Sequence, residues 1–132
     1  MRRRILLILT VFGVILGVAS AQTSGGEMAE GQYTLTAIYP KTEGSSFDMD
    51  YYNTSHGPLV QELFQPVSIQ VNKGVSGAEE GSEPAYWVIT VITFDSLEAL
   101  QNAVAEHGEE VIGDIQNFTD VEVQLQINST TE

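Results

Sequence analysis

The segment of residues 85–94 constrains the fold more than any other part of the chain. Its ten residues, AYWVITVITF, are mostly β-branched or aromatic, which is typical of a β-strand. Both sides of this strand carry apolar side chains: Trp87, Ile89 and Val91 on one side, and Tyr86, Val88, Ile92 and Phe94 on the other. A layer of helices covers only one face of a sheet. We therefore expect the second face to meet another subunit, which predicts a homodimer.

Three further segments alternate apolar and polar residues, as half-buried strands do: residues 33–39, 67–71 and 121–127. A first helix is expected from Asp48 to Phe64. A second helix is expected to open at residues 95–98, which have the form of a capping box, and to stop at Gly108. A short third helical segment follows over residues 109–115. The order βαββα(α)β predicts an α+β, ferredoxin-like fold, a four-stranded antiparallel sheet with helices on one face.

The first 21 residues have the pattern of a secretory signal peptide. Three arginines precede an apolar run over residues 5–18, and Ala-Ser-Ala follows as a cleavage site. That run is shorter than the ~20 residues that a membrane-spanning helix needs, although an uncleaved anchor is the alternative. We expect residues 22–31 to be a flexible leader, residues 32–128 the folded domain and residues 129–132 a tail. The predicted location is secreted or periplasmic, with no membrane association after cleavage.

Removal of the signal peptide leaves a strongly acidic protein. All three arginines lie in it, so Lys41 and Lys73 remain against 18 acidic residues. We therefore expect no nucleic-acid partner, because phosphate binding needs Lys and Arg. The acidity indicates either a saline habitat or simply a soluble surface. The chain has no cysteine, which excludes disulfides and cysteine-ligated metal or iron–sulfur centres.

The segment of residues 46–59, SFDMDYYNTSHGPL, contains the best candidate for a functional residue. Asp48 is a suitable helix N-cap, and helical spacing places His56 on the same inward face as Met49 and Tyr52. Gly57-Pro58 follows directly, and proline disfavours regular helix, so the helix is expected to kink or restart there. His56 is then either a core residue with one hydrogen-bonded ring nitrogen or an acid/base group beside an irregular turn.

Several motifs resemble those of the EthD family. These are Tyr39-Pro40, then Asp-x-Asp-Tyr-Tyr with His-Gly-Pro-Leu over residues 48–59, and further matches over residues 94–99, 108–115 and 117–120. The resemblance spans residues 33–127. It implies a dimeric α+β barrel, in which two sheets close face to face, and it implies that His56 is the functional residue. EthD-like proteins are typically cytoplasmic, so the predicted export signal departs from the family.

Two functions follow from these residues. The first is acid/base or oxidoreductase-type chemistry on a small aromatic or polyketide-like compound, with His56 catalytic and Tyr51, Tyr52 and Trp87 binding the substrate. The second is a non-catalytic accessory or ligand-binding dimer. The family is often labelled oxidoreductase, but the chain has no redox-cofactor motif, so no cofactor is expected. A metal held by His56 and His107 lacks supporting spacing, and no metal is expected either.

Overall fold

Four antiparallel strands form one sheet in the computed structural model, which describes residues 32–131. The strands are β2 (Tyr33–Pro40), β3 (Ser68–Lys73), β4 (Tyr86–Phe94) and β5 (Gln124–Ser129), in the spatial order β3-β4-β2-β5. The predicted signal peptide and leader, residues 1–21 and 22–31, lie outside the described residues. The strands and helices together make up the unit Gln32–Ser129.

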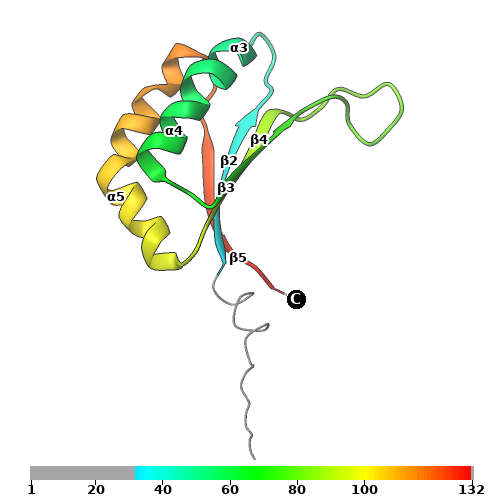
Figure 1. Cartoon of the computed structure of the whole chain (residues 1–132). Coiled ribbons are helices and arrows are strands. Elements are labelled where there is room, and N and C mark those ends of the chain that lie inside the picture. The colour runs from blue at the N-terminus through cyan, green and yellow to red at the C-terminus, as the bar shows by residue number, and fades with distance from the viewer. Residues whose placement is uncertain (1–31, 132) are drawn as a thin grey trace, which may run out of the picture. The chain divides into compact units, whose positions relative to one another are not determined.

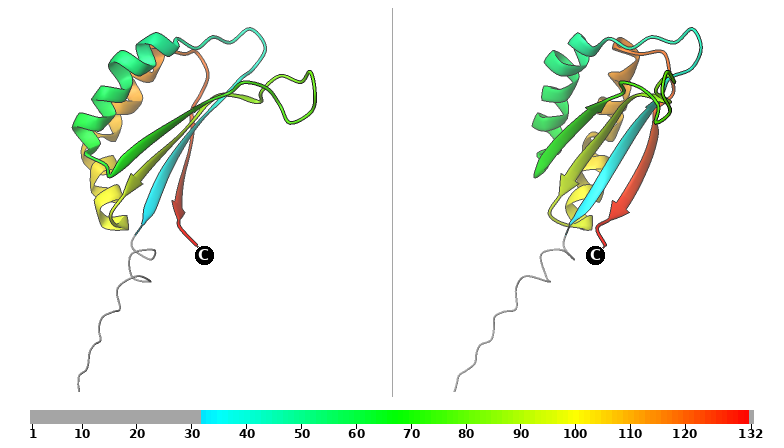
Figure 2. Two further views of the ribbon diagram at one scale, coloured as in Figure 1. Left: turned by 45° about the vertical axis from the view of Figure 1, so that its right-hand side comes forward. Right: turned by 90° about the vertical axis from the view of Figure 1, so that its right-hand side faces the viewer.

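The helices all lie on one face of this sheet (Figure 1). They are α3 (Met49–Tyr51), the π-helical turn η2 (Tyr52–His56), α4 (Gly57–Phe64), α5 (Leu97–Gly113) and the 3-10 turn η3 (Ile115–Asn117). Figure 2 shows that no helix of residues 32–129 covers the other face. The predicted α+β, ferredoxin-like architecture is confirmed. The homodimer, which would cover the open face, stays a prediction.

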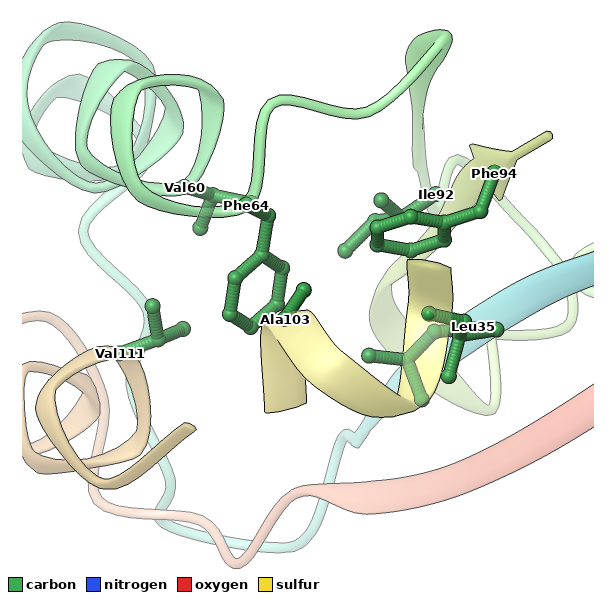
Figure 3. Packing of buried hydrophobic residues seen from close by; sticks show 8 residues of the cluster. Leu35, Val60, Phe64, Ile92, Phe94, Ala103 and Val111 are labelled. Atoms are coloured by element: carbon green, nitrogen blue, oxygen red, sulfur yellow. The ribbon is translucent and has the colours of Figure 1, made fainter. Parts of the chain in front are cut away.

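Alternation along the strands sorts their side chains between the two faces. In β4, Val88, Ile92 and Phe94 are buried against the helices, while Ile89 and Val91 lie on the open face. The predicted two-sided character of this strand is therefore correct. Figure 3 shows the core beneath the helices, where apolar side chains from the sheet, α4 and α5 point toward one another.

Helix α5 differs from its prediction at both ends. Ser96, not Asp95, is the N-cap, and its hydroxyl accepts a hydrogen bond from the Ala99 N–H at 3.0 Å. The helix does not stop at Gly108 but continues to Gly113, with Gly108 buried in its interior. The predicted stop is wrong because apolar residues such as Val111 extend the buried stripe past the glycine and stabilise the helix there.

Strand β5 begins three residues later than predicted. Residues 121–123 do not join the sheet; instead Val121 and Val123 pack against the cluster that contains Tyr39 and Phe118. Their alternating pattern is that of a strand, but this tertiary contact replaces pairing with β2.

The interior glycine of α5 gives a first prediction. Gly108→Ala should raise the free energy of unfolding by about 0.5–1 kcal/mol, because alanine loses less backbone entropy in a helix. The added Cβ would meet Val104 Cγ1 at 3.4 Å, an ordinary contact. Urea denaturation measures the change, and Gly113→Ala at the helix end is the matched control with a smaller gain. A destabilised Gly108→Ala protein would show that the backbone at this position has no room for a methyl group.

Candidate functional site

The helix that carries His56 is irregular, as the Gly57-Pro58 pair predicts. Asp48 begins it by accepting a hydrogen bond from the Tyr51 N–H at 3.0 Å. The next turn, η2, is π-helical, and the Gly57 N–H bonds to the carbonyl of Tyr52 five residues earlier. Regular helix resumes with Pro58 in the first turn of α4, where a missing N–H costs nothing. Both Tyr52 and His56 are buried by this turn, and their ring centroids lie 5.2 Å apart.

The His56 ring is held by a carboxylate from the far end of the chain. Its Nδ1 lies 2.9 Å from Oδ2 of Asp114, the residue that ends α5. The other carboxylate oxygen, Oδ1, accepts hydrogen bonds from the Tyr51 hydroxyl at 2.8 Å and from Asn117 Nδ2 at 2.9 Å. With both oxygens bonded, the carboxylate is fixed, and it fixes the orientation of the imidazole.

This environment keeps the imidazole neutral. Burial lowers the pKa of His56 below its ordinary value of 6.5, and this effect exceeds the opposing effect of Asp114, whose hydrogen bond and charge raise it. Burial also raises the pKa of Asp114, but the hydrogen bonds from His56, Asn117 and Tyr51 outweigh it, so the pKa is lowered overall. An ionised carboxylate can only accept, so Nδ1 carries the ring proton and Nε2 carries a lone pair.

A cavity of about 370 Å³ lies between the helices and the sheet, and His56 is in its wall. Four buried polar residues line it: Tyr39 from β2, Tyr52 and His56 from η2, and Thr90 from β4. A fifth polar residue in the lining, Gln126 from β5, is exposed and donates to Asn128 Oδ1. The other side chains in its wall are mainly apolar, among them Leu35, Val60, Phe64, Ile69, Ile92 and Val111. This size and composition are typical of a site for a small, largely apolar molecule.

The cavity lining includes partly exposed apolar side chains on β3, α5 and β5. Five of its lining residues are large apolar side chains that are 38–49% exposed: Val71 from β3, Val104 and Ile112 from α5, and Leu125 and Ile127 from β5. None of the lining residues is Asp, Glu, Lys or Arg, so the cavity wall suits an apolar molecule.

The four residues predicted for the site lie in different surroundings. His56 and Tyr52 line the cavity. Tyr51 bonds to Asp114 and so supports the imidazole. Trp87 lies near the start of β4, where its ring stacks on that of Phe47 with 6.3 Å between the centroids, its Nε1 donates to Ser45 Oγ at 3.0 Å, and Lys41 Nζ lies 4.8 Å from its ring centroid. Trp87 is not among the residues that line the cavity.

Sequence reasoning missed Asp114, Asn117, Tyr39 and Thr90. Tyr39 and Thr90 could have been found, because strand alternation places them on the helix side with Ala37 and Val88. Asp114 lies in a motif of the family resemblance, but no local signal pairs it with a residue 58 positions earlier.

The second histidine is separate from this site. His107 Nε2 lies 3.7 Å from Oε1 of its neighbour Glu106. No group of three His, Cys, Asp or Glu side chains in residues 32–131 is arranged to hold a metal ion.

Within the same range, no helix is both long and apolar enough to cross a membrane.

The fold and motifs assign this chain to a known family. Residues 42–122 match the EthD domain, and the chain belongs to the EthD family. It is similar to an EthD-like protein from Ralstonia eutropha JMP134, with 35% identity and a TM-score of 0.71 over 76% of this chain and 92% of that one. A hypothetical protein from Arabidopsis thaliana shares the fold at 19% identity and a TM-score of 0.53, covering 80% and 93% of the two chains. No curated protein matches this sequence.

The electrostatics of the site predict how His56 titrates. The pKa of its ring, measured by NMR in a His107→Gln background that leaves one histidine, should lie below 6.5 because burial disfavours the charged form. Asp114→Asn should lower it further, since the carboxylate raises it. A pKa above 6.5, or one that Asp114→Asn leaves unchanged, would contradict this description.

The lowered pKa of His56 also predicts how the stability of the protein depends on pH. Below pH 6.5 the unfolded chain protonates His56 while the folded protein resists it, so the free energy of unfolding should decrease as pH falls from 6.5 toward the lower folded pKa. In a His56→Gln variant this part of the decrease should disappear. Urea denaturation at a series of pH values measures both proteins, with His107→Gln as the control. Parallel curves for wild type and His56→Gln would contradict the prediction.

Proposed function

We propose that this EthD-family protein performs acid/base chemistry on a small, largely apolar organic compound, with His56 as the group that moves the proton. The observation that supports this most strongly is a neutral, carboxylate-held imidazole in the wall of an apolar cavity. Among the side chains lining the cavity, His56 alone has an ordinary pKa close to neutrality.

The surroundings of His56 suit a general base. The rings of Tyr52 and Phe118 lie 5.2 and 4.6 Å from the imidazole by centroid distance, which limits its contact with water. Nε2 is free of the Asp114 contact, because Nδ1 makes it. After Nε2 accepts a proton, the Asp114 carboxylate stabilises the imidazolium, as an acidic partner does for a catalytic histidine. Tyr51 and Asn117 hold that carboxylate and are positioning residues.

We also propose a homodimer, in which the second subunit contributes no residue to the site. The open sheet face carries apolar side chains, and a second copy of the chain would cover it. The cavity lies on the helix side of the sheet, so each subunit would hold its own site.

A screen of small aromatic and alicyclic compounds tests the proposal. Binding is followed by NMR shifts of the His56 ring and of the Val60 and Val111 methyl groups, and each compound that binds is examined for conversion or for exchange of a carbon-bound proton. We expect at least one compound class to bind and react, and His56→Gln to slow the reaction by about 10²–10⁴-fold while binding persists. His107→Gln is the matched control and should leave the rate unchanged.

The outcomes separate the two hypotheses drawn from the sequence. Binding without any His56-dependent reaction would contradict catalysis and favour a ligand-binding protein. Failure of every compound to shift the cavity resonances would contradict a small-molecule site altogether.

A further inference from the structure

Three buried hydroxyl groups lie together in the cavity beside His56. They belong to Tyr39, Tyr52 and Thr90, whose residues are 2, 3 and 2% exposed. The Tyr52 hydroxyl is hydrogen-bonded to Thr90 Oγ1, and the Tyr39 ring lies beside that of Tyr52 with 6.0 Å between the centroids. Tyr52 comes from the π-helical turn, whereas Tyr39 and Thr90 come from neighbouring strands, so this hydroxyl chain joins the helix layer to the sheet.

A count of protons shows that the hydroxyl chain has a donor to spare. Each hydroxyl carries one proton, and the hydrogen bond between Tyr52 and Thr90 uses one of the three. Among the residues that the structure describes, the three hydroxyls make no other hydrogen bond. Buried donors normally have a partner, and leaving one unpaired costs about 1–3 kcal/mol. All three side chains line the cavity, so an acceptor on a bound ligand can take this proton.

The spare donor lies close to the general base. The rings of Tyr52 and His56 are 5.2 Å apart, and both side chains face the same cavity. The base accepts a proton, the hydroxyl chain donates one, and the rest of the lining is mainly apolar. A complementary ligand has an apolar skeleton, one oxygen acceptor and a removable proton on a neighbouring atom.

We propose that the substrate is an apolar, enolisable carbonyl compound whose oxygen accepts a hydrogen bond from the Tyr39–Tyr52–Thr90 hydroxyl chain while His56 Nε2 removes the α-proton. This rests on the proposed function, because it assigns a substrate class to the same cavity. The hydroxyl chain has the role of an oxyanion-binding group.

The proposed step balances without any further reactant. The α C–H bond breaks and its proton goes to His56 Nε2, which becomes an imidazolium paired with Asp114. The C–H electron pair forms the enolate double bond, and the carbonyl π pair moves to the oxygen, where the hydroxyl chain stabilises it. Return of a proton from Nε2 to carbon regenerates a ketone. Carbon is neither oxidised nor reduced, so the step needs no electron acceptor.

Two probe molecules that differ in one oxygen test this assignment. 1-Tetralone has a carbonyl with exchangeable α-protons, and tetralin has the same skeleton without the oxygen. Binding of each is measured by NMR, and α-deuteration of 1-tetralone in D₂O is followed by mass spectrometry against buffer alone. The variants are Tyr52→Phe, Thr90→Val and His56→Gln. Thr93→Val, on the opposite face of the strand that carries Thr90, is the matched control.

We expect 1-tetralone to bind more tightly than tetralin and the protein to accelerate its α-deuteration. Tyr52→Phe should slow the exchange about 10²-fold, which is typical for loss of one oxyanion donor, and should leave tetralin binding unchanged. Thr90→Val should slow it as well, and Thr93→Val should not. Retained tetralin binding shows that each variant is folded.

The failures can be told apart. If His56→Gln abolishes exchange but Tyr52→Phe and Thr90→Val do not slow it, the hydroxyl chain has no role, and the proposed function stands. Equal affinity for 1-tetralone and tetralin would likewise overturn the hydroxyl chain's role alone. If neither probe binds, or if His56→Gln exchanges as fast as wild type, both proposals are wrong.

Discussion

The hydrogen bond between His56 and Asp114 is the interaction on which the site depends. It connects the π-helical turn at residues 52–56 to the end of α5, two segments that are 58 residues apart at this contact. It selects the ring tautomer and raises the pKa of His56, but burial outweighs this effect and keeps the imidazole neutral at neutral pH. Tyr51 and Asn117 extend the contact into a network that holds the carboxylate. Without Asp114 the imidazole would be buried with no partner to fix its tautomer and orientation.

The cavity depends on how the helix layer meets the sheet. Helix α5 runs without a break past Gly108, which, with Val104 and Ile112, lines the side of the cavity that faces β5. The buried polar side chains of the wall are His56 and the hydroxyl chain, and the remaining wall is mainly apolar. This arrangement strengthens each electrostatic interaction inside the cavity, because little water competes with it.

Local patterns predicted most of the fold and only part of the site. Strand alternation, the Asp48 cap and the Gly57-Pro58 irregularity are encoded within a few residues, and the structure agrees with each. The predicted stop at Gly108 and the early start of β5 were wrong because tertiary packing outweighed local propensity. Asp114 was missed for a related reason. A partner distant in sequence becomes visible only when the chain is folded.

The tautomer of His56 tests the central claim most directly. Long-range ¹H–¹⁵N NMR of the imidazole at neutral pH distinguishes the two neutral forms and the charged form. We predict a proton on Nδ1, donated to Asp114, and an unprotonated Nε2 available to a ligand. A proton on Nε2, or a charged ring at neutral pH, would contradict the account, because His56 would then have no lone pair with which to accept a proton in the cavity.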